Sequence, residues 1–528
     1  MNNNFRADLL YSSLFLISSL LLLTWSPISP LGVFTKFSVL TLLTAVSMFA
    51  KEQGILFLAF WWLIEFLKTR GVRKRVFSAK FLIFCSAMSL NLSLLVFIRL
   101  WVNNFEKPTF QRNDNPTAFE QQFSSRILNF GYIHFLNVAI LLFPNWLCFD
   151  WAMGCLTKLT FFDKRIFILV AFWSILSLMA VKILFNLRAR KLEYLALCLL
   201  ITPFVLSMNV FVYVGFVIAE RNLYLSQAGM SLIISKGFLK LNNFLQSKHK
   251  KLFLYFPMGL LLLSFAAKSY IRGLQWRNEV DLFNSGLTIC PKNAKVHYNI
   301  AKKLADDNKT QEAVIFYKES IRLEPDYEHA LNNLGNLLKT RKQFAEAEKL
   351  LEKATLINPK FSAAFMNLGI VEQAQGKYEN AEKSYLQALK FRYSCSVPFM
   401  IFINQPFFFL RPMYPDCEFN LGNLYLKTRK FEDAEKRFRA GAKLGHQLSF
   451  VNLIIFLDEQ SRFEEAQDLA VEAINKFPSN PEFLFQYANI LGQQVGHQIF
   501  SINIQITLSV VSRPSLKRVR NFIYEQYL

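Results

Sequence analysis

Hydrophobic residues are arranged in two different ways along this 528-residue chain. Up to about residue 270 they form long uninterrupted blocks, and beyond it they recur at helical spacing among charged residues. A block of about 20 apolar residues is long enough to cross a bilayer as a helix. The pattern therefore predicts a multi-pass membrane unit over 1–270, with spans at 9–24, 34–50, 55–67, 81–101, 166–185, 194–218, 223–235 and 252–267.

Basic residues between these blocks predict how the membrane unit is oriented. They gather in three short runs, at 68–80, 188–191 and 236–251, and short loops rich in lysine and arginine stay in the cytosol. Placing all three runs in the cytosol alternates correctly with the helices between them. The segments then predicted to be lumenal are the N-terminus, the turn 51–54, the long loop 102–164, the turn 219–221 and everything after about residue 267.

Charged residues at two of these lumenal turns interrupt apolar sequence and are candidates for a functional site. Lys51 and Glu52 form one pair, and Glu220 and Arg221 form the other. A charge at that depth is costly unless it is paired or solvated in a cavity. Such residues either bind a ligand or form ion pairs that join two helices, and the sequence leaves both interpretations open.

The long loop 102–164 contains amphipathic sequence rich in aromatic residues. Residues 132–143 and the run 146–151 suit a helix lying in the membrane interface. Anchoring to lipid is one interpretation, and contact of Asp150 and Trp151 with an amphiphilic lipid-linked substrate is the other. Two of the seven cysteines, Cys148 and Cys155, lie close together in this loop. In an oxidising compartment they either pair or remain two isolated structural thiols.

Composition and charge narrow the classes of function. Hydrophobic residues make up 53% of the chain and charged residues 19%, which is too apolar for an ordinary soluble protein. The net charge of +22 comes from basic runs between apolar blocks, so it reports topology, and no nucleic-acid partner is predicted. No cluster of His, Cys or Asp has metal-ligand spacing, so no metal site is predicted.

A 34-residue period dominates the chain after residue 270. Prolines, alanines and a Leu-Gly pair all follow it, at Pro291, Pro325 and Pro359, at Ala313, Ala347 and Ala381, and at Leu334-Gly335 and Leu368-Gly369. This is the period of tetratricopeptide (TPR) repeats. The sequence therefore predicts an α-solenoid over 271–392 and 413–492. Its concave groove is expected to bind secretory-pathway proteins, either as acceptors or as clients.

Two stretches break this period. Gly369 is followed by its counterpart Gly422 after 53 residues, and the excess lies in the apolar, proline-punctuated insert 393–412. The tail 493–528 also loses the pattern. We interpret both as gene-model or splicing artefacts rather than designed structure. Elsewhere in the repeats, Asn308-Lys309-Thr310 forms a sequon at a turn between two helices, which makes Asn308 a candidate N-glycosylation site.

Several motifs together resemble one known family. They are Arg6-Ala7-Asp8-Leu9-Leu10, Lys51-Glu52-Gln53-Gly54, the run 147–155, Ala219-Glu220-Arg221-Asn222-Leu223-Tyr224-Leu225, Trp276-Arg277-Asn278-Glu279 and the repeats. No single motif is specific, but their order and spacing are. The chain is similar to the transmembrane and TPR-containing proteins, O-mannosyltransferases of the endoplasmic reticulum, over nearly its whole length apart from the two aberrant stretches.

This resemblance implies an all-α fold, a C-type glycosyltransferase-like bundle of membrane helices followed by a lumenal TPR solenoid. It also implies transfer of mannose from dolichyl phosphate mannose to Ser or Thr of secretory-pathway proteins, with cadherin-type ectodomains as acceptors. No cofactor beyond this lipid-linked donor is expected. Arg221 is expected to hold the donor phosphate, oriented by Glu220, with Tyr224 one turn along. Lys51 and Glu52 form a second candidate group.

The chain departs from the family pattern at its N-terminus. Family members carry an additional membrane helix and a first lumenal loop with acidic residues, whereas this chain joins the pattern only at about Phe5-Arg6. We therefore expect an N-terminally truncated form in which the catalytic carboxylate is not assigned. Two functions remain: an O-mannosyltransferase, inactive as given if that loop is required, or a non-catalytic lumenal adaptor anchored in the membrane. A transporter is disfavoured, because no internal membrane repeat is visible.

Overall fold

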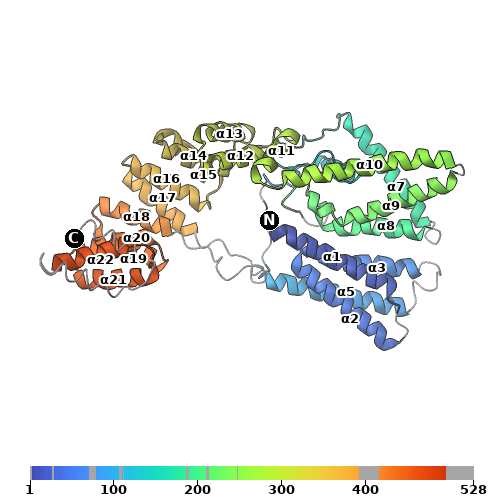
Figure 1. Cartoon of the computed structure of the whole chain (residues 1–528), viewed down its shortest axis with the longest axis horizontal. Coiled ribbons are helices and arrows are strands. Elements are labelled where there is room, and N and C mark those ends of the chain that lie inside the picture. Colours follow the sequence, from blue (N-terminus) through green and yellow to red (C-terminus); the bar gives the residue numbers. More distant parts are fainter. Residues whose placement is uncertain are drawn as a thin grey trace. The chain divides into compact units, whose positions relative to one another are not determined.

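The computed structural model describes residues 3–26, 29–69, 79–105, 110, 112–185, 190–209, 213–245, 248–391 and 415–494 (Figure 1). Every regular element in these ranges is a helix, which confirms the predicted all-α class. The chain divides into two compact units, Met1–Pro325 and Asp326–Leu528. The predicted insert 393–412 and residues 495–528 of the predicted tail lie outside the described residues.

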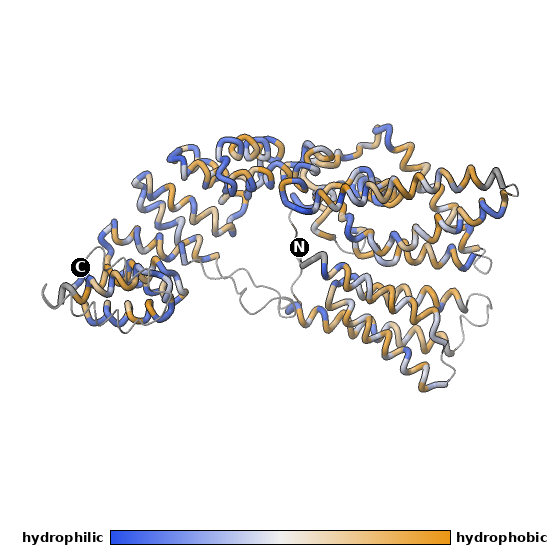
Figure 2. Tube along the Cα trace, viewed as in Figure 1, coloured by the Kyte–Doolittle hydropathy of each residue, from blue (hydrophilic) through white to orange (hydrophobic). Residues whose placement is uncertain are grey.

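Five long apolar helices of the first unit match predicted membrane spans. They are α1 (Asn3–Thr24), α2 (Pro30–Ala50), α5 (Ala79–Val102), α7 (Arg165–Phe185) and α10 (Lys248–Gln275). Hydrophobic residues predominate along them (Figure 2). Within the described ranges, seven helical segments, these five included, have the length and hydropathy needed to cross a bilayer.

The helix in the predicted span 55–67 is shorter than the roughly 20 residues that cross a bilayer without tilt or thinning. The span consists of the end of a 3₁₀ turn, η1 (Glu52–Ile55), and of the 14-residue helix α3 (Leu56–Thr69). α3 supplies core residues, because Phe57, Phe60 and Ile64 are each at most 2% exposed. The apolar character of this segment therefore reflects packing against other helices of the unit, among them α1 and α5.

Irregular backbone interrupts the predicted span 194–218 and precedes the helix of the predicted span 223–235. α8 (Lys191–Ile201) passes into a 3₁₀ helix, η2 (Thr202–Met208), where Pro203 lacks the N–H that a continuing α-helix needs. Asn209 then adopts a left-handed conformation, with φ 57°, and ends the element. A second 3₁₀ turn, η3 (Glu220–Leu223), precedes α9 (Ser226–Phe244). These breaks place polar residues at the ends of the helices, and three of them, Ser207, Asn209 and Asn222, are buried.

Two glycines bring these irregular segments close to neighbouring helices. A Cβ at Gly54 would lie 2.4 Å from the carbonyl carbon of Ser47 in α2. A Cβ at Gly229 in α9 would lie 2.4 Å from the backbone nitrogen of Leu200 in α8. Only glycine permits backbones to approach so closely. Gly54 therefore fixes the turn after α2, and Gly229 fixes α9 against α8.

The segment between α5 and α7 contains α6 (Phe123–Leu142), which begins nine residues before the predicted 132–143. Its length and composition fit a membrane span, but α7 crosses its middle. Arg165, at the start of α7, lies over the Tyr132 ring. Trp173, two turns further along α7, lies beside His134, only two residues from Tyr132. The interface orientation predicted for this segment therefore stays a prediction, and Trp146, which follows the helix, is exposed.

The remaining helices form the antiparallel pairs that the 34-residue period predicts. In the first unit they are α11 (Glu279–Ile289), α12 (Ala294–Asp306) and α13 (Thr310–Leu323). In the second unit they are α14 (Glu328–Thr340), α15 (Phe344–Ile357), α16 (Ser362–Ala374), α17 (Tyr378–Lys390), α18 (Pro415–Lys427), α19 (Phe431–Lys443), α20 (Gln447–Glu459), α21 (Phe463–Lys476) and α22 (Pro481–Gln494). The periodic prolines lie in the turns between pairs.

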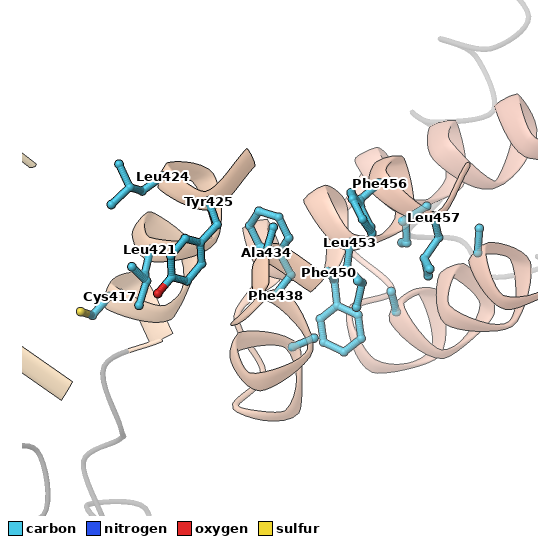
Figure 3. Close-up of a cluster of buried hydrophobic side chains, with 14 of the residues drawn as sticks. Cys417, Leu421, Leu424, Tyr425, Ala434, Phe438, Phe450, Leu453, Phe456 and Leu457 are labelled. Atoms are coloured by element: carbon cyan, nitrogen blue, oxygen red, sulfur yellow. The ribbon is translucent and has the colours of Figure 1, made fainter. Parts of the chain in front are cut away.

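Packing inside each pair explains the periodic glycines and alanines. A Cβ on Gly422 of α18 would meet the Phe438 ring of α19 at 2.6 Å. Phe438 is fully buried in a core that continues to Phe450 in α20 (Figure 3). The alanines at the repeat period have no exposed surface: Ala313, Ala347 and Ala381. Small residues thus let the two helices of a pair approach each other, as the sequence predicts.

Candidate functional site

Four polar or charged side chains from three separate segments meet at one point in the first unit. Asp8 comes from α1, Lys51 follows α2, and Arg221 and Asn222 belong to η3. The Lys51 ammonium donates hydrogen bonds to Asp8 and, at 2.8 Å, to the side-chain oxygen of Asn222. The Nε of Arg221 lies 3.5 Å from the other carboxylate oxygen of Asp8. We call these four residues the basic cluster.

Further hydrogen bonds hold the basic cluster in place. The side-chain nitrogen of Asn222 donates to the Ser207 hydroxyl at 3.3 Å, and that of Gln53 donates to the same hydroxyl at 2.8 Å. These bonds join η2, η3 and the turn after α2. Because Gly54 packs directly against α2, backbone packing as well as hydrogen bonding sets the position of Lys51.

The basic cluster carries more positive than negative charge. Lys51 and Arg221 share the single carboxylate of Asp8, which is 7% exposed. Burial lowers the pKa of Lys51, and the Asp8 carboxylate opposes this shift by stabilising the ammonium form. The side chain of Arg221 is 46% exposed. An accessible guanidinium beside a second cation is suited to binding an anion. Its planar set of N–H donors matches the oxygens of a phosphate.

Glu52 belongs to a different ion pair from Lys51. Its carboxylate accepts a hydrogen bond from Arg99 in the last turn of α5. The Arg99 side chain is 9% exposed, whereas that of Glu52 is 61% exposed. Joining of helices therefore describes Glu52, and Lys51 also pairs with a residue of another helix, Asp8 of α1.

Glu220 contacts Arg272 of α10 and not its sequence neighbour Arg221. The Nη2 of Arg272 lies 3.6 Å from one Glu220 oxygen, and the indole N–H of Trp151 donates to the other at 3.3 Å. Burial raises the pKa of Glu220, while Arg272 and the Trp151 hydrogen bond oppose the rise. The residue beside Arg221 is therefore Asp8, in place of the predicted Glu220.

The loop after α6 packs against the first repeat helices. Lys295 in α12 lies 2.9 Å from a carboxylate oxygen of Asp150, and the Ala294 N–H donates to the Met153 carbonyl at 3.1 Å. Gly154, with φ 89°, follows in a left-handed conformation, and a Cβ there would lie 2.6 Å from a backbone oxygen. Asp150 is held by this docking, and Trp151 is only 7% exposed. We call residues 144–160 the docked loop.

A disulfide closes the same contact. Cys155 of the docked loop is bonded to Cys290, which follows α11. Cys148 is a buried free thiol, and burial raises its pKa to about 11. The considered Cys148–Cys155 pair is therefore not formed, because Cys155 meets a cysteine 135 residues away in the sequence. The covalent bond ties the docked loop to the start of the repeats.

The other predicted site residues lie at the surface. Tyr224, directly after η3, is 58% exposed, and Asn308 is exposed in the turn between α12 and α13 with φ 61°. Sequence reasoning missed Asp8, Asn222 and Arg272. Asp8 could have been found, because it is a lone acid beside an apolar block, whereas neutral Asn222 gives no charge signal. Among the described residues, no group of three His, Cys, Asp or Glu is placed to hold a metal ion.

Family models match segments in both halves of the chain. Residues 104–177 match the model described as "Protein O-mannosyl-transferase TMTC, DUF1736". This range contains α6, the docked loop and most of α7. Residues 304–368 and 362–392 match two tetratricopeptide-repeat models.

Individual proteins are similar to parts of the chain. Protein O-mannosyl-transferase TMTC4 of Mus musculus is 38% identical over 227 residues, covering 42% of this chain and 30% of that protein. Protein O-mannosyl-transferase F38B6.6 of Caenorhabditis elegans is 36% identical over 294 residues, covering 56% and 39% respectively. Among solved structures, the TPR protein YrrB is 19% identical with a TM-score of 0.29, covering 38% of this chain and 96% of that one. The chain spans less than half the length of these curated relatives.

Proposed function

We propose that this chain, which belongs to the TMTC family of protein O-mannosyl-transferases, transfers mannose from dolichyl phosphate mannose to Ser or Thr hydroxyls of secretory-pathway proteins. Cadherin-like ectodomains are the expected acceptors. The observation that carries the proposal is the basic cluster, in which Lys51 and the accessible Arg221 share one buried carboxylate. A lipid-linked sugar phosphate is an anion that reaches its enzyme from the membrane, and Lys51 of this cluster directly follows the apolar helix α2.

The cluster fits the leaving-group side of mannosyl transfer. The acceptor hydroxyl oxygen attacks C1 of mannose, the bond from C1 to the phosphate oxygen breaks, and dolichyl phosphate leaves with the electron pair. Arg221 and Lys51 would stabilise the charge that develops on this phosphate. The exposed Tyr224 is close enough in sequence to contact the donor beside them. The hydroxyl proton goes to a carboxylate base, and we assign none of Asp8, Glu52 or Glu220 to that role, because each is held in an ion pair.

We further infer that the protein lies in the endoplasmic-reticulum membrane with its repeats in the lumen. The disulfide between Cys155 and Cys290 supports this location, because such bonds persist in oxidising compartments. It also joins a loop and a repeat turn that were independently predicted to be lumenal. The exposed sequon at Asn308 lies on the same predicted side.

Mannosyl transfer by the purified chain with dolichyl phosphate mannose and a cadherin ectodomain tests the proposal. Arg221→Ala should lower kcat/KM for the donor roughly ten- to hundredfold, the effect of losing a charge-assisted hydrogen bond. Arg277→Ala is the matched control, since Arg277 is exposed between α10 and α11, and its activity should equal that of the unchanged chain. An Arg221→Ala variant with normal kcat/KM would make the phosphate assignment wrong.

A lumenal adaptor is the second candidate function, favoured by the docked loop. The disulfide and the Lys295–Asp150 ion pair hold the start of the repeats firmly on the membrane unit, as an anchor for client proteins requires. The two functions differ in one result. An adaptor retains client proteins through its repeats but transfers no mannose at any donor concentration, whereas an enzyme labels the acceptor.

A further inference from the structure

The contacts of the Arg221 side chain hold its guanidinium only loosely. Its Nε lies 3.5 Å from a carboxylate oxygen of Asp8, which is longer than an ordinary N–H···O hydrogen bond. Nearly half of the side chain, 46%, is exposed. A group that has to be ordered when its ligand binds lowers the affinity for that ligand. The position of Arg221 therefore depends on the backbone turn that carries it, η3.

η3 is a short turn, and Glu220 is its first residue. The turn comprises four residues, and the Asn222 N–H donates to the Ala219 carbonyl at 3.0 Å. A second backbone hydrogen bond runs from the Tyr224 N–H to the Arg221 carbonyl at 3.3 Å. Glu220 and Arg221 are adjacent within this closed turn. A displacement of Glu220 therefore moves the backbone of Arg221.

Two largely buried side chains from other segments hold the carboxylate of Glu220. The indole N–H of Trp151 donates to one oxygen at 3.3 Å, and the Nη2 of Arg272 lies 3.6 Å from the other. Trp151 is 7% exposed and the Arg272 side chain is 13% exposed. Water and salt screen such an enclosed pair less than an exposed one. Both oxygens of Glu220 thus face partners that are themselves fixed.

The partners of Glu220 connect it to the start of the repeats. The Nη1 of Arg272 donates to the Ser285 hydroxyl of α11 at 3.2 Å, and the guanidinium lies over the ring of Trp276. Trp151 belongs to the docked loop, which the disulfide ties to the residue after α11. A continuous set of contacts therefore runs from the first repeat helices through Glu220 to the basic cluster.

We propose that Trp151 and Arg272 are positioning residues for Arg221, and that they act on it through Glu220 and the backbone of η3. This inference rests on the proposed function, because it concerns how Arg221 meets the donor phosphate. The two donors also keep the Glu220 carboxylate from pairing with Arg221, where it would compete with the phosphate. Neither Trp151 nor Arg272 has to touch the donor for this role.

The Kd of dolichyl phosphate mannose, measured with the full chain in detergent, tests the inference. Trp151→Phe removes the indole N–H and keeps an aromatic ring. It should raise Kd about three- to tenfold, the factor that corresponds to the net contribution of one hydrogen bond. Trp146→Phe is the matched control, because Trp146 lies in the same loop and is 59% exposed. The Kd of this control should equal that of the unchanged chain.

A double-mutant cycle separates positioning from a merely structural role. If Trp151 acts through Arg221, Trp151→Phe should raise Kd in the unchanged chain but not in the Arg221→Ala variant. Partial unfolding would instead lower the number of donor sites per chain and leave the Kd of the remaining sites unaltered. Equal fold-changes in the two backgrounds would overturn the inference, and so would an unchanged Kd in Trp151→Phe.

Arg272 supplies a second pair of variants, which remains decisive if Trp151→Phe does not fold. Arg272→Lys keeps a cation beside Glu220, whereas Arg272→Gln removes it and frees the carboxylate to pair with Arg221. Arg272→Gln should therefore raise Kd about tenfold, and Arg272→Lys should raise it less. A Kd for Arg272→Gln no higher than that for Arg272→Lys would overturn the inference alone. An unchanged Kd in Arg221→Ala would overturn the phosphate assignment and the inference together.

Discussion

Removing the disulfide between Cys155 and Cys290 should loosen the docked loop from the first repeat. The bond joins residues 135 positions apart, and in the chain-entropy model a closed loop of that length restrains the unfolded chain by about 5 kcal/mol. The ion pair between Lys295 and Asp150, at 2.9 Å, remains in a Cys290→Ser variant. We therefore expect the local opening free energy to fall by about 2–4 kcal/mol, less than the full chain-entropy value.

Hydrogen exchange measured by mass spectrometry follows this opening locally. In Cys290→Ser, amide protons of the docked loop and of the first turn of α12 should exchange faster, and those of α14 to α22 should not change. Cys85→Ser is the matched control, because Cys85 is a free, half-buried cysteine of α5. Unchanged exchange at the docked loop would refute the reasoning. Thiol labelling of the unreduced chain that protects Cys148 in place of Cys155 would refute it as well.

Three further predictions concern packing, the basic cluster and pH. Gly422→Ala should destabilise the repeats by about 1–3 kcal/mol, because the new Cβ would lie 2.6 Å from the Phe438 ring; a urea midpoint equal to that of the unchanged chain would contradict this. Asp8→Ala should lower the melting temperature, because it leaves the largely buried Lys51 without its carboxylate partner. Breaking a buried ion pair costs about 3–5 kcal/mol. An unaltered melting temperature would contradict the ion pair between Lys51 and Asp8. Burial raises the pKa of the Glu372 carboxyl above 4.5. The stability that protonated Glu372 contributes is therefore present below pH 4.5 and is lost as pH rises through the raised pKa. Glu372→Gln should flatten this decline in stability, measured by urea titrations at several pH values.

Local patterns in the sequence predict most of the helices but not which of them face lipid. The helix pairs of the repeats and the spans α1, α2 and α5 follow from periodicity and length. The sequence predicts α3 as a span, and a helix buried in protein has the same apolar composition as one that faces lipid. Phe57 and Phe60 are buried against other helices, and the sequence contains no signal that distinguishes this from contact with acyl chains.

Contacts between distant segments explain why the site was only partly predicted. Cys155 was considered with Cys148, and Glu220 with Arg221, because these residues are neighbours in sequence. Adjacent residues of a helical turn point in different directions, so Glu220 and Arg221 meet separate partners. The charged turns themselves were located correctly, since a charge within apolar sequence is visible without knowledge of the fold.

Affinity for the lipid-linked donor tests the assignment of the basic cluster most directly. We would measure the Kd of dolichyl phosphate mannose for the unchanged chain, for Arg221→Ala and for the control Arg277→Ala, each in the same detergent. The phosphate assignment predicts a Kd roughly ten- to hundredfold higher for Arg221→Ala and no change for the control. Equal Kd values for all three proteins would contradict it.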